Sequence, residues 1–145
     1  MAPQPHERIV IGVDGSESSL RALAWAARQA ELTGARLEVV TTWQWPMTYG
    51  GPLPYANDWD PSADAHKVQA EAVEPVRRKH PDLEIDLTVV EGHAAPALVS
   101  ASRGADLLVV GSRGHGEFVG MLLGSVSEHC VTNAHCPVLV LRNDV

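Results

Sequence analysis

The chain has 145 residues, of which 45% are apolar and 20% charged, and its formal net charge is −7. The length fits one domain of roughly 100–200 residues, and no stretch approaches the ~18 consecutive apolar residues of a membrane span or the apolar segment of a secretory signal. The acidic charge argues against an extended nucleic-acid surface, which needs clustered Lys and Arg. We therefore expect one cytoplasmic domain, residues 1–145, without nucleic-acid or membrane partners.

The first third of the chain predicts a strand, a turn, a helix and a second strand. Residues 8–13 form a short β-branched run that ends in Asp14-Gly15-Ser16, a pattern typical of a buried strand followed by a turn. Residues 18–33 have helical spacing, and Gly34 is placed to end the helix. The expected apolar face comprises Leu20, Leu23, Ala24, Ala27 and Ala30. Residues 37–43 predict a strand that runs parallel to the first.

Residues 44–61 interrupt this pattern. They form a stretch longer than the ~12–15 residues that compact domains tolerate without secondary structure, so we expect a lid, a binding loop or disorder. Five of the seven aromatic residues of the chain lie in or beside it: Trp43, Trp45, Tyr49, Tyr55 and Trp59. An aromatic lid that stacks on a ligand and an aromatic contact between subunits are both compatible with this clustering.

The remaining elements alternate between helices and strands. Residues 62–80 predict a helix with a kink or break near Glu74, because Pro75 lies inside it. Residues 83–89 alternate in polarity, as expected of an edge strand, and a short helix follows over residues 96–103. Residues 105–110 are continuously apolar, which indicates a strand buried on both faces.

The end of the chain predicts one more helix and one more strand. The helix follows Gly124 and carries Val126, Cys130 and Val131, and residues 137–141 form the fifth strand. The order predicts a single doubly wound, Rossmann-like α/β domain with a five-stranded parallel sheet and helices on both faces. In such domains ligands bind beyond the carboxyl ends of the strands.

The densest chemical signal is the glycine-rich segment 111–125, between a buried strand and a helix. Glycine allows the backbone to approach a ligand closely, and the free N–H groups of a helix N-terminus favour phosphate. Strand-to-helix loops are also glycine-rich without a ligand, so composition alone leaves the role open. A Walker A loop is excluded because the only lysines, Lys67 and Lys79, lie elsewhere. A dinucleotide fingerprint is excluded because it belongs after the first strand.

The spacing Gly111-x2-Gly114-x9-Gly124-Ser125 resembles the signature of the universal stress protein family, in its ATP-binding branch. Val13-Asp14-Gly15-Ser16 resembles the short motif that follows the first strand in the same family. The resemblance covers nearly the whole chain, from the first strand to the terminal one.

This resemblance implies a site for ATP, alone or with Mg²⁺. The implied contacts are Gly12, Val13 and Asp14 to adenine and ribose, the main chain of Thr42 or Val40 to the adenine edge, Gly111, Arg113 and Gly114 to ribose and phosphates, and Gly124, Ser125, Val126 and Ser127 to the phosphate chain. Two of these residues have simpler explanations. Asp14 suits a cap for the next helix, and arginines such as Arg113 are common on surfaces.

The function that the resemblance implies is that of a regulatory ATP-binding module in stress or dormancy. It acts on a protein partner that the sequence does not name, and it forms a homodimer through its last strand. A slow ATPase or nucleotidyl transferase and a cyclic-AMP-binding protein are the alternatives. Efficient phosphoryl transfer needs metal ions and a positioned nucleophile, and the sequence shows no dedicated Mg²⁺ carboxylates beside the glycine-rich segment and no obvious base, so we expect any hydrolysis to be slow.

A metal site is not expected. His129-Cys130 and His135-Cys136 are adjacent pairs rather than ligands at zinc spacing. We expect Cys130 to pack in the core and both cysteines to remain thiols.

Overall fold

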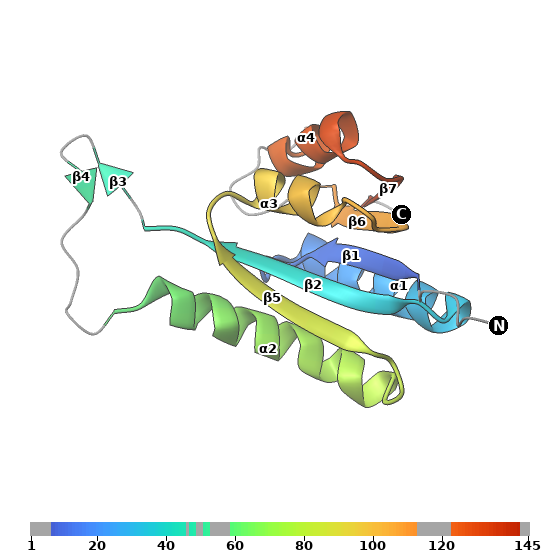
Figure 1. Ribbon diagram of the computed structural model, residues 1–145. Coiled ribbons are helices and arrows are strands. Elements are labelled where there is room, and N and C mark those ends of the chain that lie inside the picture. Colours follow the sequence, from blue (N-terminus) through green and yellow to red (C-terminus); the bar gives the residue numbers. More distant parts are fainter. Residues whose placement is uncertain (1–6, 46, 49–50, 53–58, 113–122, 143–145) are drawn as a thin grey trace.

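The computed structural model describes residues 7–45, 47–48, 51–52, 59–112 and 123–142. Helices and strands alternate along them (Figure 1). In chain order the elements are β1 (Arg8–Gly12), α1 (Glu17–Thr33), β2 (Arg36–Trp43), β3 (Met47–Thr48), β4 (Gly51–Pro52), α2 (Pro61–Lys79), β5 (Ile85–Glu91), α3 (Ala94–Ala101), β6 (Leu107–Gly111), α4 (Ser125–Asn133) and β7 (Val138–Leu141).

Five strands form one parallel sheet in the order β5-β2-β1-β6-β7. The chain first builds outward from β1 through β2 to β5, and then crosses to the other side of β1 for β6 and β7. The predicted doubly wound sheet is therefore confirmed, as is the edge position of β5. The direction of winding reverses between β1 and β6, and such a switch point opens a crevice at the carboxyl ends of the strands.

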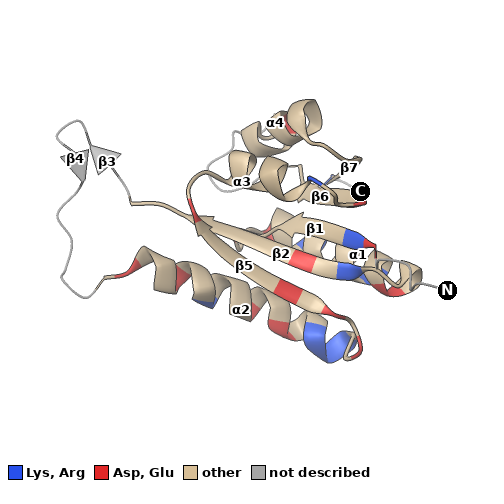
Figure 2. Cartoon of the chain, in the orientation of Figure 1, with Lys and Arg blue, Asp and Glu red and all other residues tan. Residues whose placement is uncertain are grey.

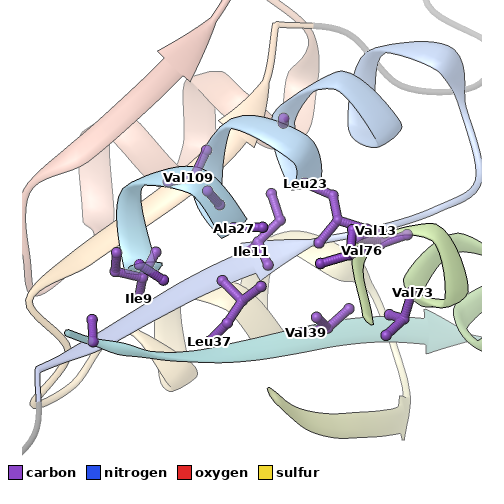
Figure 3. Packing of buried hydrophobic residues seen from close by; sticks show 14 residues of the cluster. Ile9, Ile11, Val13, Leu23, Ala27, Leu37, Val39, Val73, Val76 and Val109 are labelled. Atoms are coloured by element: carbon purple, nitrogen blue, oxygen red, sulfur yellow. The ribbon is translucent and has the colours of Figure 1, made fainter. Parts of the chain in front are cut away.

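The two faces of the sheet carry two separate hydrophobic cores, because successive side chains of a strand point to opposite faces. Ile9, Ile11, Leu37, Val39 and Val109 pack under α1 and α2 (Figure 3). The even-numbered residues Val10, Val40, Leu108 and Val110 pack under α3 and α4 instead. Val10 and Leu108 are fully buried, as expected of central parallel strands.

The buried face of α1 differs from the predicted one. Leu23, Ala27 and Ala30 are buried as expected, but Leu20 is 40% exposed and Ala24 is exposed. The buried stripe instead includes Ser18, Ser19, Ala22 and Ala26. The prediction followed hydrophobicity, whereas the helix turns its smallest side chains toward the sheet because they permit a close approach. Gly34 ends the helix as predicted, with a φ of 77°.

Helix α2 is continuous through Pro75, so of the predicted kink or break near Glu74 the break is wrong. Pro75 and Glu71 both lie on the exposed side. Water can therefore bond the Glu71 carbonyl, which loses its i+4 partner to proline. Val131 of α4 is 52% exposed.

Residues 44–61 are not wholly irregular. They contain a short antiparallel hairpin, in which Met47 pairs with Pro52. Figure 1 shows β3 and β4 standing away from the sheet, beyond the end of β2.

Charged residues lie on the helices and on strands β1, β2 and β5, with one local concentration (Figure 2). Arg77, Arg78 and Lys79 occupy the last turn of α2, where cations interact favourably with the helix dipole. Within the described residues, no helix is long and apolar enough to cross a membrane.

Candidate functional site

A pocket opens at the carboxyl ends of β1, β2 and β6, at the switch point of the sheet. It is lined by Gly12, Val13, Asp14, Ser19, Val40, Thr42, Ala94, Leu98, Val110, Gly111, Gly124, Val126 and Ser127. Three strand ends and the first turns of α1, α3 and α4 thus meet around one cavity.

Nine of the twelve residues singled out from the sequence line this pocket: Gly12, Val13, Asp14, Val40, Thr42, Gly111, Gly124, Val126 and Ser127. Ser125 is the first residue of α4 but is not among the lining residues. Arg113 and Gly114 lie outside the described residues.

The sequence prediction missed four lining residues: Ser19, Ala94, Leu98 and Val110. Ala94 and Leu98 stand one helical turn apart on α3, so they share a face. Nothing in the local sequence shows that this face meets the end of β1. Val110 was predicted as part of a buried strand, and only the sheet order brings it to the pocket.

Close packing explains two of the glycines at the pocket. A Cβ on Gly12 would lie 2.7 Å from Leu98 Cδ1. A Cβ on Gly111 would lie 2.2 Å from Ser18 Oγ and 3.0 Å from the main-chain carbonyl of Ser18. The Leu98 contact is with the end of a flexible side chain that can move aside, whereas the Ser18 contact includes main-chain atoms, so the fold itself opposes a side chain most strongly at Gly111.

The turn after β1 is held by its own polar groups. The N–H of Ser16 donates to Asp14 Oδ1 at 2.9 Å, and Ser16 Oγ accepts from the N–H of Ser19 at 3.2 Å. Ser16 is therefore the N-cap of α1, and the alternative role of Asp14 as the helix cap is wrong. Asp14 is exposed at the pocket, where its carboxylate supplies negative charge and hydrogen-bond acceptors.

Beside the pocket, the main chain of β2 extends past the end of its neighbour β1. The carbonyl of Val40 accepts from the N–H of Val13 at 2.9 Å. In a parallel strand alternate residues direct their main-chain groups to the same neighbour, so Thr42 points to the same side as Val40. β1 ends at Gly12, which pairs with Val40, so Thr42 lies two residues beyond the last partner of β1. It lines the pocket, with its main-chain groups directed to the side of β2 on which β1 has ended.

The two ends of the glycine-rich segment are joined at its base. The carbonyl of Ser112 accepts from the N–H of Gly124, and Ser127 Oγ donates to the same carbonyl at 3.1 Å. The Ser127 hydroxyl is also 3.0 Å from the carbonyl of Gly124 and is buried. It thus holds the start of α4 against the end of β6.

Two helix N-termini face the pocket without a side-chain cap. The N-cap of α4 is Gly124, which has no side chain to cap the helix. The N-cap of α3 is His93, whose side chain makes no capping hydrogen bond among the described residues. The first N–H groups of a helix have no intrahelical partner, and they carry the positive end of its dipole. The pocket therefore offers favourable positions for anionic groups without a lysine.

The cysteines behave as expected of core residues. Cys130 is fully buried, and burial raises the pKa of its thiol to about 11. Cys136 is partly buried, and the pKa of its thiol is raised mainly by this burial. Among the residues that the structure describes, no group of three His, Cys, Asp or Glu could hold a metal ion.

Three tryptophans pack together at the two ends of residues 44–61, the aromatic segment. Trp45 lies edge-on to Trp43, with ring centroids 6.1 Å apart, and edge-on to Trp59 at 5.6 Å. Trp59 Nε1 donates to Asp64 at 3.0 Å, which ties the cluster to the first turn of α2. None of these three tryptophans lines the pocket. The other two aromatics of the segment, Tyr49 and Tyr55, lie outside the described residues.

The fold and the pocket define a doubly wound α/β domain with a ligand crevice at its switch point. The model of the Universal stress protein family matches residues 5–142, and the chain belongs to that family.

Curated relatives are 33% identical to the chain over the part that aligns with it. Universal stress protein Rv2624c of Mycobacterium tuberculosis is 33% identical over 137 residues, which are 94% of this chain and 48% of that protein. Universal stress protein Rv1996 of the same organism is 33% identical over 147 residues, covering 97% and 45% of the two chains. The chain spans about half the length of the curated relatives it matches.

Solved structures show the same fold. A universal stress protein in complex with cAMP is 30% identical, with a TM-score of 0.70 over 95% of this chain and 98% of that one. The universal stress protein from Archaeoglobus fulgidus in complex with dAMP has a TM-score of 0.65 over 93% and 97% of the chains. It is 24% identical, so its likeness shows the fold alone.

Proposed function

We propose that this domain is a regulatory nucleotide-binding module that holds ATP in the pocket at the carboxyl ends of β1, β2 and β6. The observation that carries the proposal is that nine residues predicted for the site, from three separate segments of the chain, line that one pocket. The universal stress protein in complex with cAMP, 30% identical, supports an adenine nucleotide as the ligand class.

Each part of the nucleotide has a matching part of the pocket. Asp14 accepts a hydrogen bond from a ribose hydroxyl, and the main chain of Thr42 meets the polar edge of adenine. Val40, Leu98 and Val110 supply apolar surface for the flat base. The phosphates lie at the N-terminus of α4, with Arg113 and Gly114 contributed by the preceding segment.

The same chemistry favours binding over rapid hydrolysis. Asp14 is the sole carboxylate among the lining residues that the structure describes. Phosphoryl transfer depends on a positioned nucleophile and on metal ions that neutralise developing charge. We therefore propose that nucleotide binding changes how the protein engages a regulatory partner, in stress or dormancy, with at most slow ATP hydrolysis.

Cyclic AMP is the second candidate ligand, favoured by the relative in complex with cAMP. The two ligands make different demands on the pocket. Cyclic AMP keeps the 2′-hydroxyl for Asp14 but carries a single phosphate, whereas ATP extends a phosphate chain toward α4. The ratio of the affinities for ATP and cyclic AMP therefore measures how much the N-terminus of α4 contributes to nucleotide binding.

Calorimetry with ATP, ADP, AMP and cyclic AMP tests the proposal. We expect saturable binding of ATP to the wild-type protein and about tenfold weaker binding of both ATP and ADP to Asp14→Ala, the loss of one hydrogen bond to a charged group. Loss of ATP binding alone would place Asp14 at a bound metal instead. Gly124→Ala should weaken ATP more than cyclic AMP. Absence of binding to all four nucleotides would overturn the proposal.

We also propose assembly as a homodimer through β7. This strand is an edge of the sheet, and its four residues, Val138–Leu141, are all only partly buried. An apolar edge strand favours pairing with another chain. Sedimentation equilibrium should give twice the monomer mass, and a monomer at micromolar concentration would contradict the assignment.

A further inference from the structure

The peptide bond between Val13 and Asp14 is held from both sides by buried hydroxyl groups. Thr41 Oγ1 donates to the carbonyl oxygen of Val13 at 2.9 Å. The N–H of Asp14 donates to Ser19 Oγ at 3.3 Å. The carbonyl and N–H of a trans peptide point in opposite directions, so these two contacts fix the plane of one rigid unit.

The first of these hydroxyls is itself held by a buried amide on α2. Gln69 Nε2 lies 2.9 Å from the carbonyl of Thr88, 3.1 Å from that of Val39 and 3.3 Å from Thr41 Oγ1. Its two hydrogens are thus shared among three acceptors. Gln69 is 1% exposed and Thr41 3% exposed, although both lie on the face of the sheet that is otherwise packed with apolar side chains.

Burying polar side chains in an apolar layer costs free energy unless their hydrogen bonds are satisfied, and apolar residues would fill the same space without that condition. Here the satisfied chain of bonds runs from α2 through Thr41 to Val13, and it ends at the residue that precedes Asp14. Neither Gln69 nor Thr41 lines the pocket, whereas Val13, Asp14 and Ser19 do.

We propose that Thr41 is a positioning residue of the pocket, held in place by Gln69, and that it sets nucleotide affinity by fixing the Val13–Asp14 peptide. This inference rests on the proposed nucleotide site. The Thr41 hydroxyl sets the direction of the Val13 carbonyl, the rigid peptide transmits that direction to the Asp14 N–H, and the carboxylate of Asp14 is thereby aimed at the ribose.

The test compares two substitutions at one position. Thr41→Val keeps the shape of the side chain but removes the hydroxyl, and we expect ATP to bind about five- to tenfold more weakly, the size of one net hydrogen bond. Thr41→Ser restores the hydroxyl and should bind ATP within about twofold of the wild type. Gln69→Met should weaken binding in the same direction, and it provides the measurement if Thr41→Val does not fold.

The control is Ser102→Ala, which removes another buried hydroxyl. Ser102 Oγ donates to the carbonyl of Val99 at 2.6 Å, at the end of α3 away from the pocket. We expect it to lower the free energy of unfolding while leaving ATP affinity unchanged. If Ser102→Ala weakens ATP as much as Thr41→Val does, loss of stability explains both, and the positioning role is wrong.

A second measurement separates this inference from the nucleotide proposal. In nucleotide-free protein, the amide resonance of Asp14 should move in Thr41→Val and return in Thr41→Ser. Wild-type affinity in Thr41→Val, or an unmoved Asp14 resonance, would overturn the inference. Absence of ATP binding to the wild type would instead overturn the nucleotide site itself.

Discussion

Gly111, the last residue of β6, lies directly against Ser18 in the first turn of α1. The space for a Cβ at Gly111 is taken up by the Ser18 hydroxyl, 2.2 Å away, and by the carbonyl of Ser18 at 3.0 Å. Ser18 is also one of the small residues that the sequence prediction left out of the buried face of α1. The contact joins the end of a central strand to the start of a helix at the pocket wall.

Gly111→Ala should therefore destabilise the protein, by about 1–3 kcal/mol, as expected for overpacking against main-chain atoms. Urea denaturation measures the change. Gly34→Ala is the comparison, because Gly34 has open space around it and only its φ of 77° opposes a side chain. It should cost about 1–2 kcal/mol, from the left-handed backbone alone. Adding Ser18→Ala to Gly111→Ala should recover only part of the loss, and full stability of Gly111→Ala would contradict the contact.

Arg8, at the start of β1, contacts β2, the end of α3 and the connection that follows α3. Its guanidinium pairs with the carboxylate of Glu38 and donates to the carbonyls of Ala101, at 3.1 Å, and Arg103, at 2.8 Å. The side chains of Arg8 and Glu38 are only 18% and 20% exposed. Arg8→Met should lower the free energy of unfolding by about 1–3 kcal/mol, because it leaves a partly buried carboxylate and two carbonyls without this partner.

Arg36→Met provides the matched control for Arg8→Met. Arg36 also pairs with a carboxylate on the neighbouring strand, Asp86, but at 3.6 Å and with side chains 42% and 49% exposed. Exposed ion pairs contribute about 0–1 kcal/mol, so this variant should be close to the wild type in urea. Equal losses for the two variants would show that burial does not set the strength of the Arg8 pair.

The buried thiol of Cys130 predicts a pH dependence of stability. Its pKa is about 11 in the folded protein against an ordinary value of 9.0. Below pH 9 the thiol is protonated in both states, and this contribution to stability is fully present. Between pH 9 and pH 11 the unfolded chain releases the proton first, so the free energy of unfolding falls as the pH rises. Cys130→Ala should lose stability less steeply over this range, and an identical slope would contradict the assignment.

The three-tryptophan cluster predicts how fluorescence responds to nucleotide. Trp43, Trp45 and Trp59 pack on one another and do not line the pocket, so we expect ATP to leave their emission nearly unchanged. A Trp25→Phe background removes the remaining tryptophan, which lies in α1. A marked change with ATP, or protection of residues 44–61 from proteolysis, would instead favour the lid over the subunit contact.

Most of the fold could be predicted from the sequence because each element has a local signature. The β-branched run before Asp14 and the apolar run before Gly111 indicate buried strands, and Gly34 marks a helix end. The errors arose where the tertiary environment overrides local preference. Leu20 is more hydrophobic than Ser18, but only a small side chain fits against Gly111. Pro75 disfavours a helix interior, but its exposed side lets water satisfy the carbonyl that loses a partner.

The candidate site also contains residues that local sequence predicts and residues that it does not. Residues that belong to contiguous motifs, such as Asp14 and Gly124, could be selected from spacing. Leu98 and Thr41 could not, because their relation to the pocket exists only once α3 and β2 are placed beside β1. Thr41 in particular looks like any β-branched strand residue until its hydroxyl is seen to meet the carbonyl of Val13.

A titration of ¹⁵N-labelled protein with ATP, followed residue by residue by NMR, tests the central claim most directly. We predict the largest saturable shifts at the amides of Gly12, Val13, Asp14, Thr42 and Gly111 and through the first turn of α4, with little change along α2. An unchanged spectrum, or shifts confined to residues outside the pocket, would contradict the assignment of this pocket as a nucleotide site.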